Sequence, residues 1–248
     1  MHNFELEKLI NMYLNIDKYQ DYAPNGLQVE GKSEVKKILT GVTASQELLN
    51  EGVKLSVDAI IVHHGYFWKN ESDIISHMKR NRLKTLLCND INLYSYHLPL
   101  DAHPVIGNNV QFAKLLEVEI DKYILPFVPM GKFLKIITAY DLILRLSNKL
   151  NRQPLYVAGD YGVKEIRTVA WCTGSGQNFI QAAAEAGADA FITGEVSEQT
   201  IHIAREMGIH FYSAGHHATE RLGIKMLGKW LEEKYNFSVC FIDIPNPV

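Results

Sequence analysis

The chain has 248 residues, of which 47% are hydrophobic and 21% are charged, and its formal net charge is −3. This is the composition of an ordinary globular protein, and the length suffices for one large or two small domains. Basic residues do not cluster beyond short pieces such as residues 79–84. The sequence therefore argues against strong, salt-driven binding of a nucleic-acid backbone, whereas nucleotide-sized anions stay possible.

The amino-terminal residues predict a helix rather than a targeting segment. Apolar residues recur at helical spacing over residues 6–14, and no apolar run approaches the roughly 18 residues that a membrane span needs. Cys88, Cys172 and Cys240 lie far apart without a CxxC spacing, which excludes a thiolate zinc ribbon and fits a reducing compartment. We therefore expect a cytoplasmic protein with no membrane partner, and we expect the cysteines to be small core residues.

Two segments of the chain resemble each other. When residues 37–65 are set above residues 168–196, Gln46, Asp58 and Ile61 fall on identical residues at one offset of 131 positions (189 minus 58). Residues 91–97 match residues 209–215 at an offset of 118, which places an insertion in the first half near residues 68–80. We predict an internal repeat.

Each copy of the repeat has the pattern of a strand, a small-residue turn, a helix and an apolar strand. Strands that alternate with helices are typical of parallel β-α-β units. We therefore predict an α/β protein of two related lobes, each with a mainly parallel sheet, over residues 1–125 and 126–248. Residues 237–241 alternate as a last strand, and the carboxyl-terminal segment could pack back on the first lobe.

Histidines and carboxylates follow the predicted strands. In the first half, histidines and carboxylates follow the strands predicted at residues 58–62 and 91–96. In the second half, they follow the two matching strands. Open α/β sheets bind ligands at the carboxyl ends of their strands, so these residues could converge. The candidates are His63, His64, His97, Asp101, Glu195, His216 and Glu220.

The spacing of these residues suits divalent metal ions. Residues 216–233 predict a helix, and His216 and Glu220 share a face of its first turn while His217 points away. His63 and His64 diverge at a strand end, so each could reach a different ion. Any single pair is better explained by a hydrogen-bonded core or surface histidine pair or by a helix-start charge. Their joint occurrence at matching strand ends favours a metal site with open positions for water.

The sequence is similar to the Nif-three-like dinuclear-metal family, whose members are labelled GTP cyclohydrolase I type 2 homologs. The similarity runs from PNGLQVEG through VHHGYFW, HLPLDAH and FITGEVSEQT to AGHHATER, over nearly the whole chain. It implies the Nif-three-like fold, a homohexameric ring and two divalent ions per subunit, with Zn, Fe, Mn and Ni not distinguished. The metal ligands that it implies are His63, His64, Asp101, His216 and Glu220.

The donor set and the resemblance together predict a dinuclear metal-dependent hydrolase that uses a metal-bridged hydroxide. The family label points to a purine nucleotide as the small-molecule substrate. His97 is a candidate for proton transfer, with a turn-stabilising histidine as the alternative. Glu195 is a candidate for orienting water or a ligand histidine, with a helix-start charge as the alternative. A non-catalytic metal-binding or metal-handling ring with a regulatory role is the other function left open.

Two features have no assigned role. Tyr66, Phe67 and Trp68 could stack on a purine base, pack in the core or lie exposed at a subunit interface. The turn Gly174-Ser175-Gly176 resembles a phosphate nest, but it matches neither GxGxxG, because Phe179 occupies the last position, nor the lysine-containing P-loop.

Overall fold

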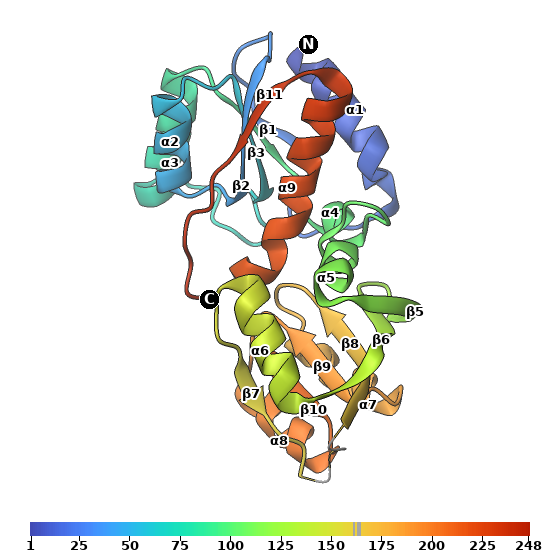
Figure 1. The fold of residues 1–248 in the computed structure, drawn as a ribbon. Coiled ribbons are helices and arrows are strands. Elements are labelled where there is room, and N and C mark those ends of the chain that lie inside the picture. Colours follow the sequence, from blue (N-terminus) through green and yellow to red (C-terminus); the bar gives the residue numbers. More distant parts are fainter. Residues whose placement is uncertain (161, 163–164) are drawn as a thin grey trace. The chain divides into compact units, whose positions relative to one another are not determined.

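The computed structural model describes residues 1–160, 162 and 165–248, which form two compact units (Figure 1). The first unit comprises Met1–Ile106 and Gly223–Pro245, and the second comprises Gly107–Leu222 and Asn246–Val248. The boundary between Leu222 and Gly223 falls inside the long helix α9 (His216–Tyr235). In the part of the chain that the structure describes, no helix is both long and apolar enough to span a membrane.

The first unit contains a five-stranded sheet. In spatial order the strands are β1 (Gly26–Val29), β4 (Asn92–Ser95), β3 (Ala59–His64), β2 (Lys37–Thr43) and β11 (Ser238–Phe241). The last four are parallel and β1 is antiparallel to β4, so the carboxyl ends of β2, β3 and β4 meet at one edge. The strand expected near residues 237–241 is present and pairs with β2.

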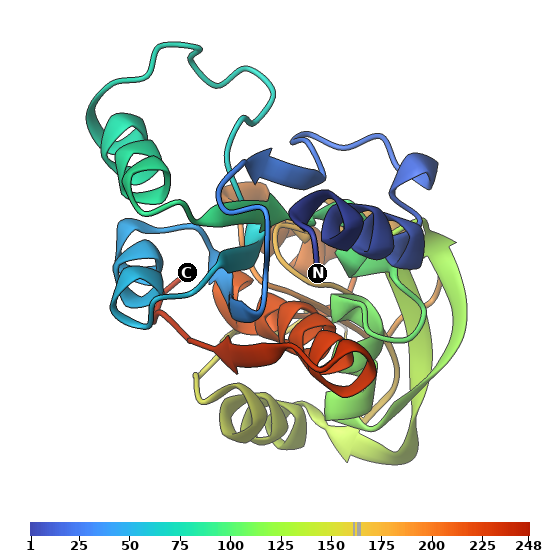
Figure 2. The same ribbon diagram turned by 90° about the horizontal axis from the view of Figure 1, so that it is seen from above.

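Helices cover both faces of the first sheet, as Figures 1 and 2 show. They are α1 (Asn3–Leu14), the 3-10 turn η1 (Ile16–Lys18), α2 (Gln46–Lys54), α3 (His77–Cys88), α4 (Leu98–Ala102) and the later part of α9. Ile38 and Ile61 belong to the core with α1 and α9, whereas Leu39 and Ile60 belong to the core with α2 and α3. This alternation is why the strands read as continuous apolar runs.

The second unit contains a six-stranded sheet. In spatial order the strands are β5 (Val118–Leu125), β6 (Val128–Thr138), β8 (Glu165–Cys172), β9 (Ala190–Thr193), β10 (His210–Ser213) and β7 (Leu155–Val157). Strands β8, β9 and β10 are parallel, and the others join antiparallel. The helices are α5 (Asn108–Leu116), α6 (Ala139–Leu150), η2 (Gln177–Phe179), α7 (Ile180–Glu185), α8 (Glu198–Glu206) and the start of α9.

The predicted repeat is confirmed by matching hydrogen bonds. Strands β2, β3 and β4 with α2 and α3 correspond to β8, β9 and β10 with α7 and α8. Asp58 precedes β3, and its carboxylate accepts hydrogen bonds from the amides of Lys36 and Lys37. Asp189 precedes β9 and accepts in the same way from the amides of Arg167 and Thr168. The α/β class and its two sheets with parallel strands are therefore as expected.

The compact units do not follow the predicted lobe ranges. Residues 107–125 belong with the second unit because β5 pairs with β6, and residues 223–245 belong with the first because β11 pairs with β2. The lobe ranges 1–125 and 126–248 stay a prediction.

Two side chains decide between alternatives or correct them. Of the roles left open for Tyr66, packing in the core is the one observed, and exposure at a subunit interface is wrong: it is 5% exposed, and its hydroxyl donates to the Ala44 carbonyl at 2.8 Å. Phe67 beside it is 38% exposed. Cys88 is not a core residue, because it is the last residue of α3 and lies exposed, whereas Cys172 is buried.

Candidate metal centre

His63 and His64 are the last two residues of β3. The strand is thus longer than expected, and it includes both histidines instead of ending before them. Their ring centroids are 4.6 Å apart. The two rings therefore do not diverge to opposite faces of the sheet as expected. Side chains on a strand can lean along the strand direction, and here both rings lie near the strand end. The two imidazoles lie close together at the carboxyl edge of the first sheet.

The His63 imidazole is oriented by the main chain. Its Nδ1 lies 2.9 Å from the Tyr96 carbonyl oxygen, which can only accept, so Nδ1 carries a proton. Nε2 lies 3.5 Å from Oδ1 of Asp101. In a neutral ring this nitrogen is itself an acceptor, so a cation or a further proton between Nε2 and the carboxylate is favourable. His63 is fully buried and Asp101 is 7% exposed, so little water is available to solvate the carboxylate in place of a cation or proton.

The other members of the first-unit set come from the ends of neighbouring elements. His64 Nδ1 lies 3.2 Å from the Thr43 hydroxyl at the end of β2. His97 immediately precedes α4, the short helix that carries Asp101. Its ring centroid lies 5.1 Å from that of His63 and 5.7 Å from that of His64. The expectation that side chains after β3 and β4 converge therefore holds within this unit.

Asp21 orients His97, and sequence reasoning missed it. Its Oδ1 accepts from His97 Nδ1 at 2.7 Å, and its Oδ2 accepts from the Leu98 amide and from Asn25. Burial tends to raise the pKa of the Asp21 carboxyl, but the hydrogen bond to His97 and the charge of that ring lower the pKa to about 2. No strand or helix pattern pointed to Asp21, because it lies on a loop far from His97 in sequence.

Three imidazoles of the first unit are grouped closely enough to hold a metal ion. His63, His64 and His97 each offer a ring nitrogen within 4.8 Å of the others. The Trp68 ring meets His97 edge-on at 5.0 Å between centroids, and its indole nitrogen donates to the Gly65 carbonyl. Trp68 thus packs beside the histidines instead of standing free.

In the second unit, His216 lies between two carboxylates. It begins α9, and its Nε2 lies 3.0 Å from Oε2 of Glu220, as expected for residues that share the first helical turn. Its Nδ1 lies 2.6 Å from Oε1 of Glu195, which follows β9. Burial tends to lower the pKa of the His216 imidazole, but the hydrogen bonds and charges of Glu220 and Glu195 raise the pKa to about 9.

Glu195 therefore contacts the histidine, as one of the two expectations for it proposed. A carboxylate on Nδ1 fixes the tautomer and orientation of a metal-binding imidazole, so that Nε2 can bind the metal. Asp21 makes the same contact with His97 in the first unit.

The turn Gly174-Ser175-Gly176 packs around the start of α9 and does not form the phosphate nest considered above. The amide of Gly174 donates to the Thr219 hydroxyl, and that of Gly176 donates to the Thr193 hydroxyl. Gly174 has φ +71°, and a Cβ placed on it would lie 2.0 Å from Oε1 of Glu220. The glycine makes room for the Glu220 carboxylate.

His103 of the LDAH motif has a structural role. Its Nδ1 accepts from the amides of Val105 and Ile106, and its Nε2 donates to the Tyr13 carbonyl. Burial lowers the pKa of this imidazole. Both ring nitrogens are thus engaged where the chain leaves α4.

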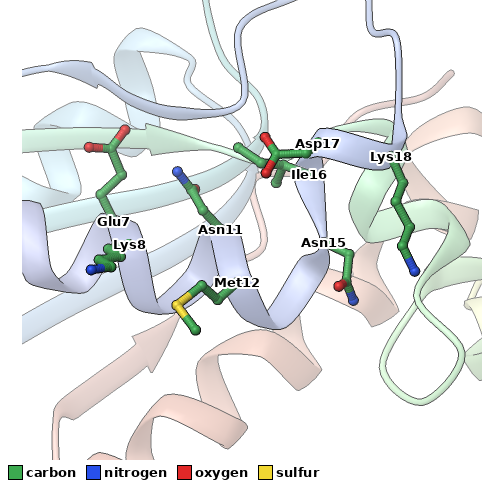
Figure 3. Close-up of a pocket in the computed structure, with 8 residues that line it drawn as sticks. All are labelled: Glu7, Lys8, Asn11, Met12, Asn15, Ile16, Asp17 and Lys18. Atoms are coloured by element: carbon green, nitrogen blue, oxygen red, sulfur yellow. The ribbon is translucent and has the colours of Figure 1, made fainter.

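A surface pocket of about 580 Å³ lies along α1 and η1 (Figure 3). Two of its lining side chains tie α1 to the first sheet: Glu7 accepts from the Leu27 amide, and Asn11 accepts from the Tyr96 hydroxyl. The described residues that line it include none of the candidate ligands: they are Glu7, Lys8, Asn11, Met12, Asn15, Ile16, Asp17 and Lys18.

The whole chain is similar to proteins from several bacteria. A model of the family described as Duf34/NIF3 (NGG1p interacting factor 3) matches residues 1–247. Relatives from Yersinia pestis and Escherichia coli K12, each named GTP cyclohydrolase 1 type 2 homolog, are 61% identical over 247 residues, which cover 100% of both chains.

Solved structures agree with this match. The structure of protein ybgI, described as of unknown function, superposes with a TM-score of 0.98 at 61% identity and covers 100% of both chains. TTHA1606 from Thermus thermophilus superposes with a TM-score of 0.91 at 34% identity, again over 100% of both chains. Reduced HcgD from Methanocaldococcus jannaschii superposes with a TM-score of 0.87 at 25% identity over 98% of both chains.

Proposed function

Because the chain belongs to the Duf34/NIF3 family, we propose that it is a hydrolase that depends on two divalent metal ions. The observation that carries the proposal is the orientation of the histidines. His63 turns Nε2 toward Asp101, and His216 turns Nε2 toward Glu220, while each Nδ1 is engaged by another group. Imidazole nitrogen beside carboxylate oxygen is a donor set that suits Zn, Mn, Fe or Ni.

The proposed ligands are those that the family resemblance implies. His63, His64 and Asp101 belong to the first unit, and His216 and Glu220 belong to the second. Metal stoichiometry tests this ligand assignment.

The chain's own side chains would orient the ligands and move a proton. When bound, two divalent ions supply Lewis acidity, which lowers the pKa of a water and stabilises the charge that develops on the attacked group. Glu195 holds His216, and the Tyr96 carbonyl holds His63, so neither ring must reorient on binding. His97, fixed by Asp21 beside the histidine pair, is the side chain that we assign to proton transfer.

The proposed substrate is a purine nucleotide of the GTP type, a small molecule. The support is the name of the relatives, GTP cyclohydrolase 1 type 2 homolog. A homohexameric ring and a cytoplasmic location complete the proposal, the first from the resemblance and the second from the three widely spaced cysteines without a CxxC motif.

Metal stoichiometry is the first test. Protein purified without a histidine tag and reconstituted with Zn²⁺ or Mn²⁺ is expected to hold two ions per chain, and His63→Ala and Glu220→Gln are each expected to lower that number. The matched control is the exposed pair Glu198 and His202 on α8, which has the same i, i+4 spacing and a 3.0 Å contact. His202→Ala should leave the metal content unchanged. A saturating value of one, unaffected by His63→Ala, contradicts the dinuclear proposal.

Hydrolysis is the second test. The metal-loaded chain is incubated with GTP, other nucleotides and phosphoesters, and ring opening or phosphate release is followed, with Glu220→Gln as the inactive control. Turnover of GTP that Glu220→Gln abolishes supports the purine substrate. Two bound ions with no turnover on any compound would favour the alternative, a metal-binding or metal-handling ring with a regulatory role.

A further inference from the structure

Helix α9, which carries His216 and Glu220, has no side chain at the position before its first residue. That position is Gly215, with φ +101°. The first amides of a helix have no partner within the helix and need an acceptor from elsewhere. Other helices here use their own preceding residue: the Ser45 hydroxyl accepts from α2, and the Thr138 hydroxyl accepts from α6. Gly215 cannot do this.

Residues 246–248 supply one acceptor for this helix start. A main-chain oxygen of Val248 accepts from the amide of His217 at 3.0 Å. The segment is folded back on itself, because the Val248 amide donates to the Asn246 side chain at 2.9 Å. These residues belong to the second unit, although the strand before them, β11, belongs to the first. The cap of α9 therefore comes from the far end of the chain.

Arg152 connects this segment to the helix start. A guanidinium nitrogen of Arg152 donates to the Pro247 carbonyl. The same side chain packs against Gly215, where a Cβ would lie 2.8 Å from its Cδ and Nε. The Arg152 main chain is itself fixed, since its amide donates to the Ser147 carbonyl at the end of α6. Glycine at position 215 is thus required both by its φ angle and by the arginine beside it.

We propose that Arg152 and residues 246–248 form a carboxyl-terminal clamp that positions the first turn of α9 for metal binding. The inference rests on the proposed metal function, because the turn that is clamped holds His216 and Glu220. If the clamp and the metal both favour one arrangement of this turn, each strengthens the other by the same factor. Arg152 and Val248 are positioning residues and do not touch the metal.

The test compares a chain that lacks residues 246–248 with the parent, using Zn²⁺ as the probe. Zn²⁺ affinity is measured by competition with a chelator, and hydrogen exchange is measured at the first-turn amides of α9. We expect about tenfold weaker Zn²⁺ binding, the change expected when the loss of one helix cap is coupled to a ligand. Faster exchange at His217 and Ala218 in the metal-free state, with partial recovery on adding Zn²⁺, is expected as well.

Arg152→Ala should weaken Zn²⁺ binding in part. Arg152→Lys should bind Zn²⁺ as the parent does, because lysine keeps a donor for the Pro247 carbonyl. Arg205→Ala, on the exposed end of α8, is the control for removing an arginine. These point variants decide the matter if the truncated chain does not fold. Val248 is 54% exposed, so truncation removes little packed surface.

The outcomes separate the two proposals. Equal Zn²⁺ affinity and equal exchange in the parent, the truncated chain and Arg152→Ala overturn the clamp. A parent that does not bind Zn²⁺, or binds it as well after Glu220→Gln, overturns the metal function instead. A uniform loss of stability with unchanged Zn²⁺ affinity in the folded state assigns the segment a structural role only, and that also overturns the clamp.

Discussion

Gly174→Ala is expected to disturb the metal site through a single methyl group. The φ of +71° at Gly174 is one that L residues adopt at a cost of roughly 1–2 kcal/mol. The added Cβ would lie 2.0 Å from Oε1 of Glu220, so the carboxylate must move. Glu220 is only 3% exposed, and it has little room to move without losing its 3.0 Å contact with His216. A hydrogen bond to a charged group contributes about 1.5–3 kcal/mol.

Gly187→Ala is the matched control. Gly187 has φ +83°, and a Cβ placed on it meets no atom within 4 Å. Gly187→Ala should therefore lower the free energy of unfolding only by the cost of the backbone conformation, roughly 1–2 kcal/mol. Gly174→Ala should lower the free energy of unfolding by about 1.5–3 kcal/mol more, and this difference should disappear when Glu220 is already alanine.

The assay is urea unfolding of the metal-free chain for both alanine variants, with and without Glu220→Ala, followed by Zn²⁺ titration. Zn²⁺ affinity should fall at least about tenfold in Gly174→Ala and stay unchanged in Gly187→Ala, since tenfold corresponds to about 1.4 kcal/mol. Equal losses of stability at the two glycines, additive with Glu220→Ala, would refute the reasoning that Glu220 occupies the space above Gly174.

Three further predictions concern stability and assembly. Asp58→Asn should destabilise the chain by about 1–2 kcal/mol near pH 7, because Asp58 accepts from Lys32 and from two main-chain amides. Burial tends to raise the pKa of the Asp58 carboxyl, but those hydrogen-bond partners lower the pKa below its value in the unfolded chain. The carboxylate therefore stabilises the fold fully above the unfolded pKa, and this stabilisation is lost as the pH falls through the folded pKa. The gap between parent and variant in urea unfolding should therefore close toward pH 3 and not toward pH 9. Chelation should lower the melting temperature by roughly 5–10 °C, because a ligand at a hundred times its Kd stabilises the folded state by about 2.7 kcal/mol. Asp101→Ala should abolish this metal-dependent rise in melting temperature, and His217→Ala should retain it. Light scattering should give six times the 28.1 kDa chain mass, and a monomer at micromolar concentration would remove the ring.

Periodicity and repetition made the fold predictable. Strands β3 and β9 each contain an apolar run, and Asp58 and Asp189 precede them and accept the same pair of main-chain hydrogen bonds. The candidate ligands were found because they end these strands or lie within a few residues after the neighbouring strands β4 and β10. Asp21 was not found, since its role depends on a loop folding back to His97, which no local pattern encodes.

Other misses came from packing that a single position cannot reveal. Gly174 looked like part of an anion-binding turn, but its freedom accommodates a carboxylate from a helix that begins more than forty residues later. Tyr66, Phe67 and Trp68 form one aromatic cluster in the sequence, yet Tyr66 is buried and donates to the Ala44 carbonyl while Phe67 is exposed. Turn glycines and aromatic side chains acquire their roles from tertiary neighbours, so sequence narrows their roles without deciding between them.

Each unit carries two carboxylates beside its candidate ligands. His97 and His216 each have a carboxylate on Nδ1, from Asp21 and Glu195, whereas His63 has a neutral carbonyl there. With the proposed ligand carboxylates of Asp101 and Glu220, each unit therefore holds two carboxylates on side chains that are buried or half-buried. Burying charge of one sign is costly unless cations balance it. A proton on the imidazole balances part of this charge in the metal-free chain, as the raised pKa of His216 shows. A divalent ion that replaces this proton would balance both carboxylates of a unit, so metal binding should release protons.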